Sequence, residues 1–254
     1  AYVADGEDVG LRVVDISDPE NPEEVGSCDT PGNAYGIAVE GEYAYIADGT
    51  AGLVVIDISN PANPFELGVF DTPGRACDVA IEGRYAYVAD GSVDGGLCVI
   101  DIFDPENPRQ VGHVLESGYQ VALSEGYAYV AAELDGLFVI DISDPANPAE
   151  VGSSHPPRLS RYTDVAVSGD FAYIPDPATG FRVIDISNPE QPEEVGFHES
   201  DGQFRHVAVE GENSYLISWR SGLTVIDISD NDNLEVLCNY YEPGETKWIE
   251  TAGD

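Results

Sequence analysis

Residues 53–58 read Leu-Val-Val-Ile-Asp-Ile, and the last four of these residues belong to the pattern that decides the fold. The pattern Val-x-Asp-Ile occurs six times along the chain. Its aspartates are Asp15, Asp57, Asp101, Asp141, Asp185 and Asp227, so successive copies are separated by 42, 44, 40, 44 and 42 residues. A period of this length, in segments of strand-like composition, is typical of β-propellers and solenoids.

The second repeat, approximately residues 33–74, shows what one unit contains. It holds four short runs that are rich in Val, Ile and Tyr and bounded by Gly, Pro, Asn or Asp. Such runs are typical of β-strands, and no segment keeps the 3.6-residue apolar period of a long helix. Four antiparallel strands form one propeller blade. The sequence therefore predicts an all-β fold, a six-bladed β-propeller of four-stranded antiparallel blades in a single domain over residues 1–254.

The two ends of the chain indicate how the predicted ring closes. The chain begins with Ala1-Tyr2-Val3-Ala4-Asp5-Gly6, which matches the second strand of a repeat, so the first blade lacks its first strand. We predict that residues 246–254 supply this strand and remove the exposed edge that an open array would leave. The six predicted repeats are approximately 1–32, 33–74, 75–116, 117–160, 161–202 and 203–245.

Several repeats resemble a known family. Leu53-Val-Val-Ile-Asp, Leu137-Phe-Val-Ile-Asp and Leu223-Thr-Val-Ile-Asp are similar to the LVIVD repeat of bacterial and archaeal surface proteins. The resemblance extends over all six repeats. It implies a propeller and a location at the cell surface, and it supplies no catalytic residues.

The repeated aspartates and tyrosines are interpreted as scaffold, because a residue that every blade needs is usually structural. Each Val-x-Asp-Ile aspartate precedes a turn such as Ser17-Asp-Pro-Glu-Asn-Pro22 or Ser59-Asn-Pro-Ala-Asn-Pro64. Asp and Asn accept backbone N–H bonds in turns, and Pro fixes the local φ angle. The Tyr-Ala-Tyr of the second strand is interpreted as packing between blades.

One loop is similar to a calcium-binding loop. Asp90-Gly-Ser92-Val-Asp94-Gly95 places oxygen donors at alternate positions and a glycine at the sixth. Asp-Gly and Gly-Gly also form ordinary hairpin turns, so both interpretations stay open. Calcium, held by Asp90, Ser92 and Asp94, is the one candidate cofactor.

The charge of the chain restricts its partners. There are 48 acidic and 10 basic residues, which gives a formal net charge of −38 at pH 7. This charge excludes nucleic acid and anionic membranes as natural partners. No apolar stretch approaches the roughly 20 residues of a membrane span, so membrane insertion is not expected. Strong acidity suits a protein that faces high salt or carries divalent cations.

The first residues and the cysteines bear on the compartment. A chain that begins within a hairpin, without an initiator Met or a signal peptide, is expected to be a processed form or part of a longer protein, which favours an extracellular or cell-surface location. Cys77 and Cys98 belong to the first and third strands of one blade, about 9–10 Å apart, which is too far for a disulfide. Cys28 and Cys238 lie on outer strands without equivalent register. We predict free thiols that are mostly buried.

The first residues of each blade are the candidate binding site. They line the mouth of the propeller channel, and they vary between repeats while the scaffold residues after them hardly vary, which is typical of recognition surfaces. Most basic residues, including Arg12 and Arg182, map to the same face. The predicted ligand- or partner-binding residues are Arg75, Arg161, Arg205, Lys247, Tyr35, Tyr119, Tyr162, Phe204, His206 and Trp248.

Three interpretations of this face stay open. The arginines and aromatic side chains form a pocket for an anionic ligand, in which Arg binds carboxylate or phosphate and the rings stack on sugar or peptide groups. Alternatively, the face docks on an acidic protein surface, including that of an identical copy, and head-to-tail docking then propagates as a filament. In the third interpretation the arginines only neutralise neighbouring acids.

The sequence gives weak support for catalysis. Three arginines at a channel mouth are similar to sialidases, but the Ser-x-Asp-x-Gly-x-Thr-Trp box of sialidase blades is missing. Asp78 and Asp164 have the chemistry of an acid and a base. They occupy equivalent positions beside Arg75 and Arg161, which favours ion pairing. The four histidines fall in different blades, and only His206 lies near the channel, where we expect a structural hydrogen bond.

We therefore predict a non-catalytic extracellular or cell-surface module for binding or assembly, with a protein partner or itself. The alternative is a propeller that binds or hydrolyses an anionic glycan or another carboxylate ligand at the arginine-rich channel mouth.

Overall fold

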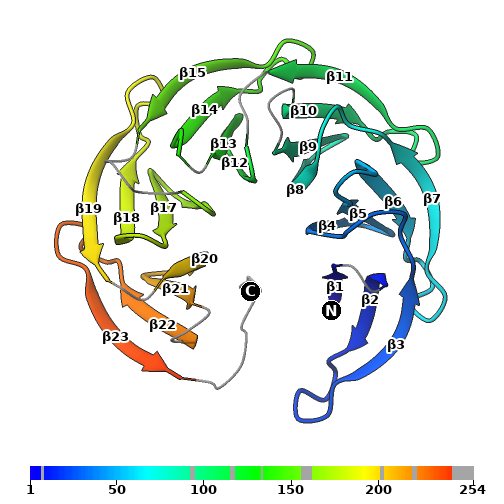
Figure 1. The fold of residues 1–254 in the computed structure, drawn as a ribbon, viewed down its shortest axis with the longest axis horizontal. Coiled ribbons are helices and arrows are strands. Elements are labelled where there is room, and N and C mark those ends of the chain that lie inside the picture. Colours follow the sequence, from blue (N-terminus) through cyan, green and yellow to red (C-terminus); the bar gives the residue numbers. More distant parts are fainter. Residues whose placement is uncertain are drawn as a thin grey trace. The chain divides into compact units, whose positions relative to one another are not determined.

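The computed structural model describes most of the chain, and the regular elements in this part are all β-strands (Figure 1). Twenty-three strands form six antiparallel sheets, and neighbouring strands of a sheet follow one another in the chain. Among these residues no helix is long and apolar enough to cross a membrane. The described residues are 1–6, 9–91, 95–114, 118–132, 134–155, 162–200, 203–218 and 222–241.

Each sheet corresponds to one repeat of the sequence. The first sheet has three strands within the described residues, and the other five have four each. The strands are β1 (Tyr2–Asp5), β2 (Gly10–Asp15) and β3 (Glu23–Cys28); β4 (Gly36–Glu40), β5 (Tyr43–Ala47), β6 (Leu53–Asp57) and β7 (Phe65–Phe70); β8 (Ala76–Glu82), β9 (Tyr85–Asp90), β10 (Gly96–Asp101) and β11 (Arg109–Val114); β12 (Gln120–Ser124), β13 (Tyr127–Ala131), β14 (Leu137–Asp141) and β15 (Ala149–Ser154); β16 (Ala166–Ser168), β17 (Phe171–Asp176), β18 (Gly180–Asp185) and β19 (Glu193–Glu199); and β20 (Phe204–Glu210), β21 (Asn213–Ser218), β22 (Gly222–Asp227) and β23 (Glu235–Tyr240).

The predicted fold class is confirmed: the protein is all-β, and its six antiparallel sheets are the blades of a β-propeller. The segment predicted to complete the first blade, residues 246–254, lies outside the described residues, so closure by this segment stays a prediction. The chain forms two compact units, Ala1–Leu123 with Ile142–Ala149 and Ser124–Asp141 with Glu150–Asp254. The first three sheets belong to the first unit, and the last two belong to the second.

Both faces of the middle strands of a blade are buried, which explains why strands such as β5 and β6 are apolar almost throughout rather than alternating with polar residues. In the second blade, Ile46 and Ile56 pack with Leu11 of the first blade. Their neighbours Tyr45 and Val55 point to the other face and pack with residues of the third blade. Because successive side chains of a strand point to opposite faces, a strand between two blades needs apolar residues at nearly every position.

The turn that follows each Val-x-Asp-Ile motif has the same structure in all six repeats. A backbone N–H bonds to the carbonyl three residues earlier, as Asn21 does with Asp18 at 3.0 Å and Asn233 with Asp230 at 3.0 Å. The motif aspartate accepts the backbone N–H two residues on, as Asp57 does from Ser59 at 2.9 Å. This contact confirms the predicted scaffold role of these aspartates.

A glycine in the outer strand interlocks each blade with the next. A Cβ atom on Gly26 of β3 would lie closer than 3.0 Å to the carbonyl oxygen of Pro61, in the turn of the following blade. Real Cβ atoms essentially never approach so closely. The same contact recurs in the pairs Gly68–Pro105, Gly112–Pro145, Gly152–Pro189 and Gly196–Asn231. The register places Cys238 at the equivalent position of β23, opposite Val225.

Candidate functional site

Main-chain bridges fix the starts of the first strands in the first compact unit. Ala34 exchanges two N–H···O bonds with Gly6, both 3.2 Å long, and Ala76 exchanges two with Gly49 at 3.0 and 3.1 Å. Each bridge joins the start of one blade to the end of the second strand in the preceding blade. The main chain therefore fixes where the residues that follow Ala34 and Ala76 begin.

Two buried aspartates organise the loops that lead into these strands. Asp48 accepts hydrogen bonds from the Thr30 hydroxyl and the Gly32 N–H, both at 2.7 Å. Asp90 accepts the N–H groups of Gly74 at 2.7 Å and Arg75 at 2.5 Å. Both aspartates are 0% exposed, and burial raises the pKa of Asp48. The carboxylate at the end of the second strand thus shapes the loop that presents Arg75.

This role bears on the predicted calcium loop. The two carboxylate oxygens of Asp90 accept backbone N–H groups from the loop before β8. The other two predicted ligands, Ser92 and Asp94, lie outside the described residues, so the calcium site stays a prediction. Among the described residues no group of three or more His, Cys, Asp or Glu side chains is arranged to hold a metal ion.

Arg75 and Tyr35 form the exposed centre of the candidate site. The guanidinium carbon of Arg75 lies 4.2 Å from the centroid of the Tyr35 ring, which is the geometry of a cation–π contact. Tyr35 is 37% exposed, and its hydroxyl accepts a hydrogen bond from the Asn33 side chain at 3.2 Å. Two residues predicted from different repeats are therefore brought together, and the ring holds the exposed guanidinium in place.

Tyr119 and Cys77 border this pair in the same unit. A Cβ atom on Gly91 would lie 2.8 Å from the Cys77 sulfur and 2.9 Å from the Tyr119 ring, so both side chains cover this glycine. The Cys77 thiol contacts the carbonyl of Arg75 at 3.3 Å, and burial raises its pKa, which keeps it protonated at neutral pH. We call Tyr35, Arg75, Cys77 and Tyr119 the Arg75 surface.

In the second unit, two of the predicted binding residues are corrected. Tyr162 is 0% exposed and Phe204 is 2% exposed, so neither ring can contact a ligand on the surface. Phe204 packs in the core with Tyr173 and Leu216, and burial raises the pKa of Tyr162 to about 12. Both side chains belong to the hydrophobic core of their blades.

Arg205 and His206 stay at the start of β20, beside Asp164. The Nδ1 atom of His206 lies 3.4 Å from a carboxylate oxygen of Asp164, which also accepts the N–H of Val207 at 3.0 Å. The Arg205 carbonyl accepts a hydrogen bond from the Thr163 hydroxyl at 3.0 Å. His206 therefore lies beside a carboxylate that has a structural role.

Asp78 and Asp164 have the same structural role in different blades. Asp78 accepts the N–H of Val121 at 3.0 Å, as Asp164 accepts that of Val207. In each case the carboxylate joins the first strand of one blade to the first strand of the next. These structural contacts are made by the two residues that the sequence suggested as an acid and a base. The predicted site residues Arg161, Lys247 and Trp248 lie outside the described residues.

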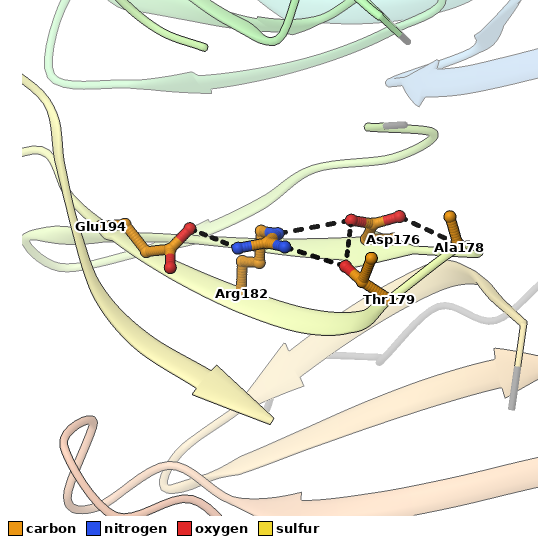
Figure 2. A network of polar contacts seen from close by, with 5 residues as sticks. All are labelled: Asp176, Ala178, Thr179, Arg182 and Glu194. Atoms are coloured by element: carbon orange, nitrogen blue, oxygen red, sulfur yellow. Dashed lines mark hydrogen bonds and ion pairs between the residues drawn. The ribbon is translucent and has the colours of Figure 1, made fainter. Parts of the chain in front are cut away.

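Two arginines assigned to this face by sequence are held within ion-pair networks. Figure 2 shows Arg182 of β18 between Glu194 on one side and Asp176 with Thr179 on the other. Its Nη1 atom lies 2.6 Å from Glu194, its Nε atom 3.3 Å from Asp176 and its Nη2 atom 2.8 Å from the Thr179 hydroxyl. Arg182 is 4% exposed and Asp176 is 0% exposed. The positive charge of Arg182 is therefore balanced by acidic residues of its own blade.

Arg12 repeats this arrangement in the first blade, with Asp5 and Glu24 as partners. The signal in the sequence is an arginine at the third residue of the third strand, together with an acid at the end of the second strand and another in the outer strand. The network was not predicted, because the three residues come from three different strands and only the register of the sheet shows that they meet.

Comparison with protein-family models assigns the chain to a family. The model of the LVIVD repeat matches residues 1–30, 31–72, 73–116, 118–155, 161–198 and 201–241. The chain belongs to the LVIVD-repeat family. A search of the curated proteins gave no match.

Solved structures similar to the LVIVD-repeat protein share its fold at low sequence identity. A putative 6-phosphogluconolactonase from Bacteroides fragilis has a TM-score of 0.80 at 13% identity, over 93% of this chain and 79% of that one. The β-propeller domain of Swd1 from Myceliophteria thermophila has 0.73 at 12%, over 96% and 84%. A protein of unknown function from Desulfotomaculum acetoxidans has 0.72 at 13%, over 87% and 74%. At these identities the likeness shows the fold alone.

Two histidines of the LVIVD-repeat protein contact main-chain carbonyl groups, and its most buried thiol is held protonated. All four cysteines are free, as predicted, but the prediction that most are buried is wrong, because Cys98 is buried, Cys28 and Cys77 are half-buried and Cys238 is exposed. Burial raises the pKa of Cys98 to about 12. His113 contacts the carbonyl of Gly95 at 3.0 Å, and His155 that of Asp135 at 2.8 Å. The Arg75 surface itself presents an exposed cation with aromatic neighbours.

Proposed function

We propose that this LVIVD-repeat protein is a non-catalytic binding module of the extracellular space or the cell surface, which holds a protein partner through the Arg75 surface. The partner presents a carboxylate or phosphate group to Arg75 and an apolar or planar group to Tyr35 and Tyr119. One observation carries the proposal: an exposed guanidinium stacked 4.2 Å from an aromatic ring, at positions that vary between otherwise regular repeats.

The stacking supports recognition because it restrains a long side chain before any partner arrives. A free arginine loses rotamer entropy when it binds, and a side chain already held on a ring loses less. The guanidinium keeps its edge available for a bidentate contact with a carboxylate or phosphate. Aromatic residues and arginine are also the side chains that contribute most often to binding energy at protein interfaces.

The surroundings of Arg75 favour a protein over a small molecule. The hollows among the described residues include one lined by the second and third blades, with Tyr43 and Arg84, and one lined by the fifth blade, with Arg182 and Phe197. Neither is lined by Arg75 or Tyr35. Small ligands are usually bound in concave pockets, whereas a protein partner can bind an open surface.

The charge of the chain adds a condition on the partner. At a net charge of −38, a strongly acidic protein would be repelled at long range. The expected partner therefore carries its anionic group within a neutral or basic surface, so that long-range attraction and the local contact with Arg75 act together.

The test is a selection of peptides from a random display library on the immobilised protein, with an array of acidic glycans in parallel. We expect peptides that contain a carboxylate beside an aromatic or aliphatic residue. Arg75→Ala should weaken their binding at least about tenfold, as for arginine anchors at interfaces. The matched control is Arg109→Ala, which removes another exposed arginine, 72% exposed, from the first position of β11.

The outcomes separate the alternatives. Peptides that bind Arg75→Ala and the wild type equally would show that the Arg75 surface is not the site. Binding of acidic glycans that depends on Arg75, without peptide binding, would replace the protein partner by a glycan.

A further inference from the structure

The third blade departs from the repeat at three positions that lie close together. The residue after its Val-x-Asp-Ile motif is Phe103, whereas the other five repeats have serine there. The turn between its first two strands carries Arg84, where three other blades have an acid (Glu42, Asp170 and Glu212). Its outer strand begins with Arg109, where β3, β19 and β23 begin with glutamate.

These three residues converge on Asp101. Arg84 contacts both carboxylate oxygens of Asp101, with its Nε atom at 3.1 Å, and Arg109 contacts the same carboxylate at 3.1 Å. The Phe103 N–H donates to Asp101 at 3.0 Å. The guanidinium carbon of Arg84 also lies 5.0 Å from the centroid of the Phe103 ring and 5.5 Å from that of Tyr85. Two arginines thus share one carboxylate, which leaves one positive charge in excess.

The arginines replace a hydrogen bond that Phe103 cannot make. In other blades the serine hydroxyl also donates to the motif aspartate, as Ser59 does to Asp57 at 2.5 Å and Ser229 to Asp227 at 2.6 Å. In the third blade Arg84, with the Phe103 N–H and Arg109, lowers the pKa of Asp101 to about 2. The Asp101 carboxylate therefore has its hydrogen-bond partners without a serine. The Phe103 ring is nevertheless 76% exposed, the highest value among the large hydrophobic side chains of the described residues.

A hollow lies directly beside this ring. It has a volume of about 440 Å³, and its lining includes Glu40, Glu42, Tyr43, Tyr45 and Phe103 itself. We call this hollow, together with Arg84, Phe103 and Arg109, the Phe103 surface. It combines the exposed Phe103 ring with a hollow lined by Tyr43 and Tyr45. It also combines the exposed Arg109 with the carboxylates of Glu40 and Glu42. All of these residues belong to the first compact unit.

We propose that the Phe103 surface pairs two copies of this chain in a two-fold symmetric dimer. Phe103 of each copy occupies the hollow of the other copy, and Arg109 of each copy faces Glu40 and Glu42 of the other. A two-fold interface uses the same patch on both copies, so it requires a patch that is complementary to itself. The Phe103 surface meets this requirement in shape and in charge, and the proposal is independent of the function proposed for Arg75.

The net charge makes the pairing dependent on salt. Two copies at −38 each repel one another at long range, and raising the ionic strength from 0.1 to 1 M shortens the screening length from about 10 to about 3 Å. The contact between Phe103 and the hollow is apolar and is not weakened by salt. We therefore expect the dimer to become tighter as NaCl is raised.

The test is sedimentation velocity of the whole chain at several protein concentrations, in 0.1 and 1 M NaCl. A concentration-dependent dimer is expected, and Phe103→Ser should weaken it at least about tenfold, as for an aromatic anchor. Phe103→Ser introduces the residue that the other five repeats already have, so the fold should be kept. The control, Leu134→Ser, removes a 61% exposed apolar side chain from another blade and should leave the dimer unchanged.

A charge exchange tests the symmetry of the pairing. Arg109→Glu alone, and Glu40→Arg with Glu42→Arg, should each weaken the dimer, because like charges then face one another. Mixing the two variants should restore a dimer that contains one copy of each. In one half of its interface the new glutamate at position 109 faces the new arginines at positions 40 and 42. In the other half Arg109 faces Glu40 and Glu42 as in the wild type. A chain that stays monomeric up to 1 M NaCl, or a dimer that persists equally in Phe103→Ser, would overturn the proposal.

Discussion

Arg12 and Arg182 occupy equivalent positions in two blades, but they differ in burial. We expect this difference to decide how much each arginine contributes to stability. Each arginine lies between an aspartate at the end of the second strand and a glutamate of the outer strand. The Arg182 side chain is 4% exposed, whereas that of Arg12 is 33% exposed. A buried charge that loses its partner is costly, whereas a solvated charge is screened by water.

The first prediction compares these two arginines. Arg182→Ala should lower the free energy of unfolding by about 3–5 kcal/mol, because the buried Asp176 then loses the guanidinium that balances its charge. Arg12→Ala should change the stability far less, because its partners are reached by water. Urea denaturation followed by fluorescence measures both. Equal losses in the two variants would show that burial does not decide the contribution of this network.

At the same scale, the sequence predicted which residues begin the first strands but not which of them face outward. Tyr162 and Phe204 were expected at the surface and are buried. One physical reason is visible in β8 and β20, where the pairing register shifts between Ala76 and Asp78 and between Phe204 and His206. Such a bulge adds one residue to a strand, and the alternation of inward and outward side chains changes there.

At the scale of the strand, the glycine of the outer strand follows from main-chain contact between blades. The sequence shows a glycine after Val or Leu in five of these strands, but period and composition do not reveal that the glycine faces a carbonyl group of the next blade. Only the register, with Gly68 opposite Val55 in β6, and the position of Pro105 show this contact. The strands themselves were predictable, because four apolar runs bounded by turn residues recur six times.

The second prediction concerns this interlock. Gly26→Ala places a methyl group against the carbonyl of Pro61, and such overpacking should lower the free energy of unfolding by about 1–3 kcal/mol. Ser27→Ala, at the next residue of β3, is the matched control, because Ser27 is exposed and the change removes no buried group. Thermal denaturation of the two variants measures the difference. A Gly26→Ala protein as stable as the control would mean that the turn moves away without cost.

At the scale of the molecule, six repeats of about 42 residues were enough to predict the propeller. A repeat of this length holds the four strands of one blade. The site was less predictable. The cation–π pair of Arg75 with Tyr35 joins two repeats whose residues stand 40 positions apart, and no pattern within one repeat contains it. The Phe103 surface became visible only when its three departures from the repeat were found beside the same aspartate.

The third prediction follows from the net charge. Self-repulsion at −38 opposes the compact state, so the midpoint of thermal unfolding should rise by several degrees between 0.05 and 1 M NaCl. The measurement belongs in the Phe103→Ser variant, so that dimer formation does not add to the effect. A neutral osmolyte at matched osmolarity is the control for general solvent effects. A midpoint that does not respond to NaCl would show that carboxylate repulsion contributes little to stability.

The interlock between blades also explains how the chain tolerates its acidity. Each glycine meets a main-chain carbonyl of the next turn, so that contact makes no demand on the side chains of the turn. The fourth residue of these turns accordingly varies freely, as Glu20, Ala62, Glu106, Ala146, Glu190 and Asp232. The surface side chains of such a protein can therefore be substituted to suit a high or a low ionic strength, while the main-chain contacts between its blades stay the same.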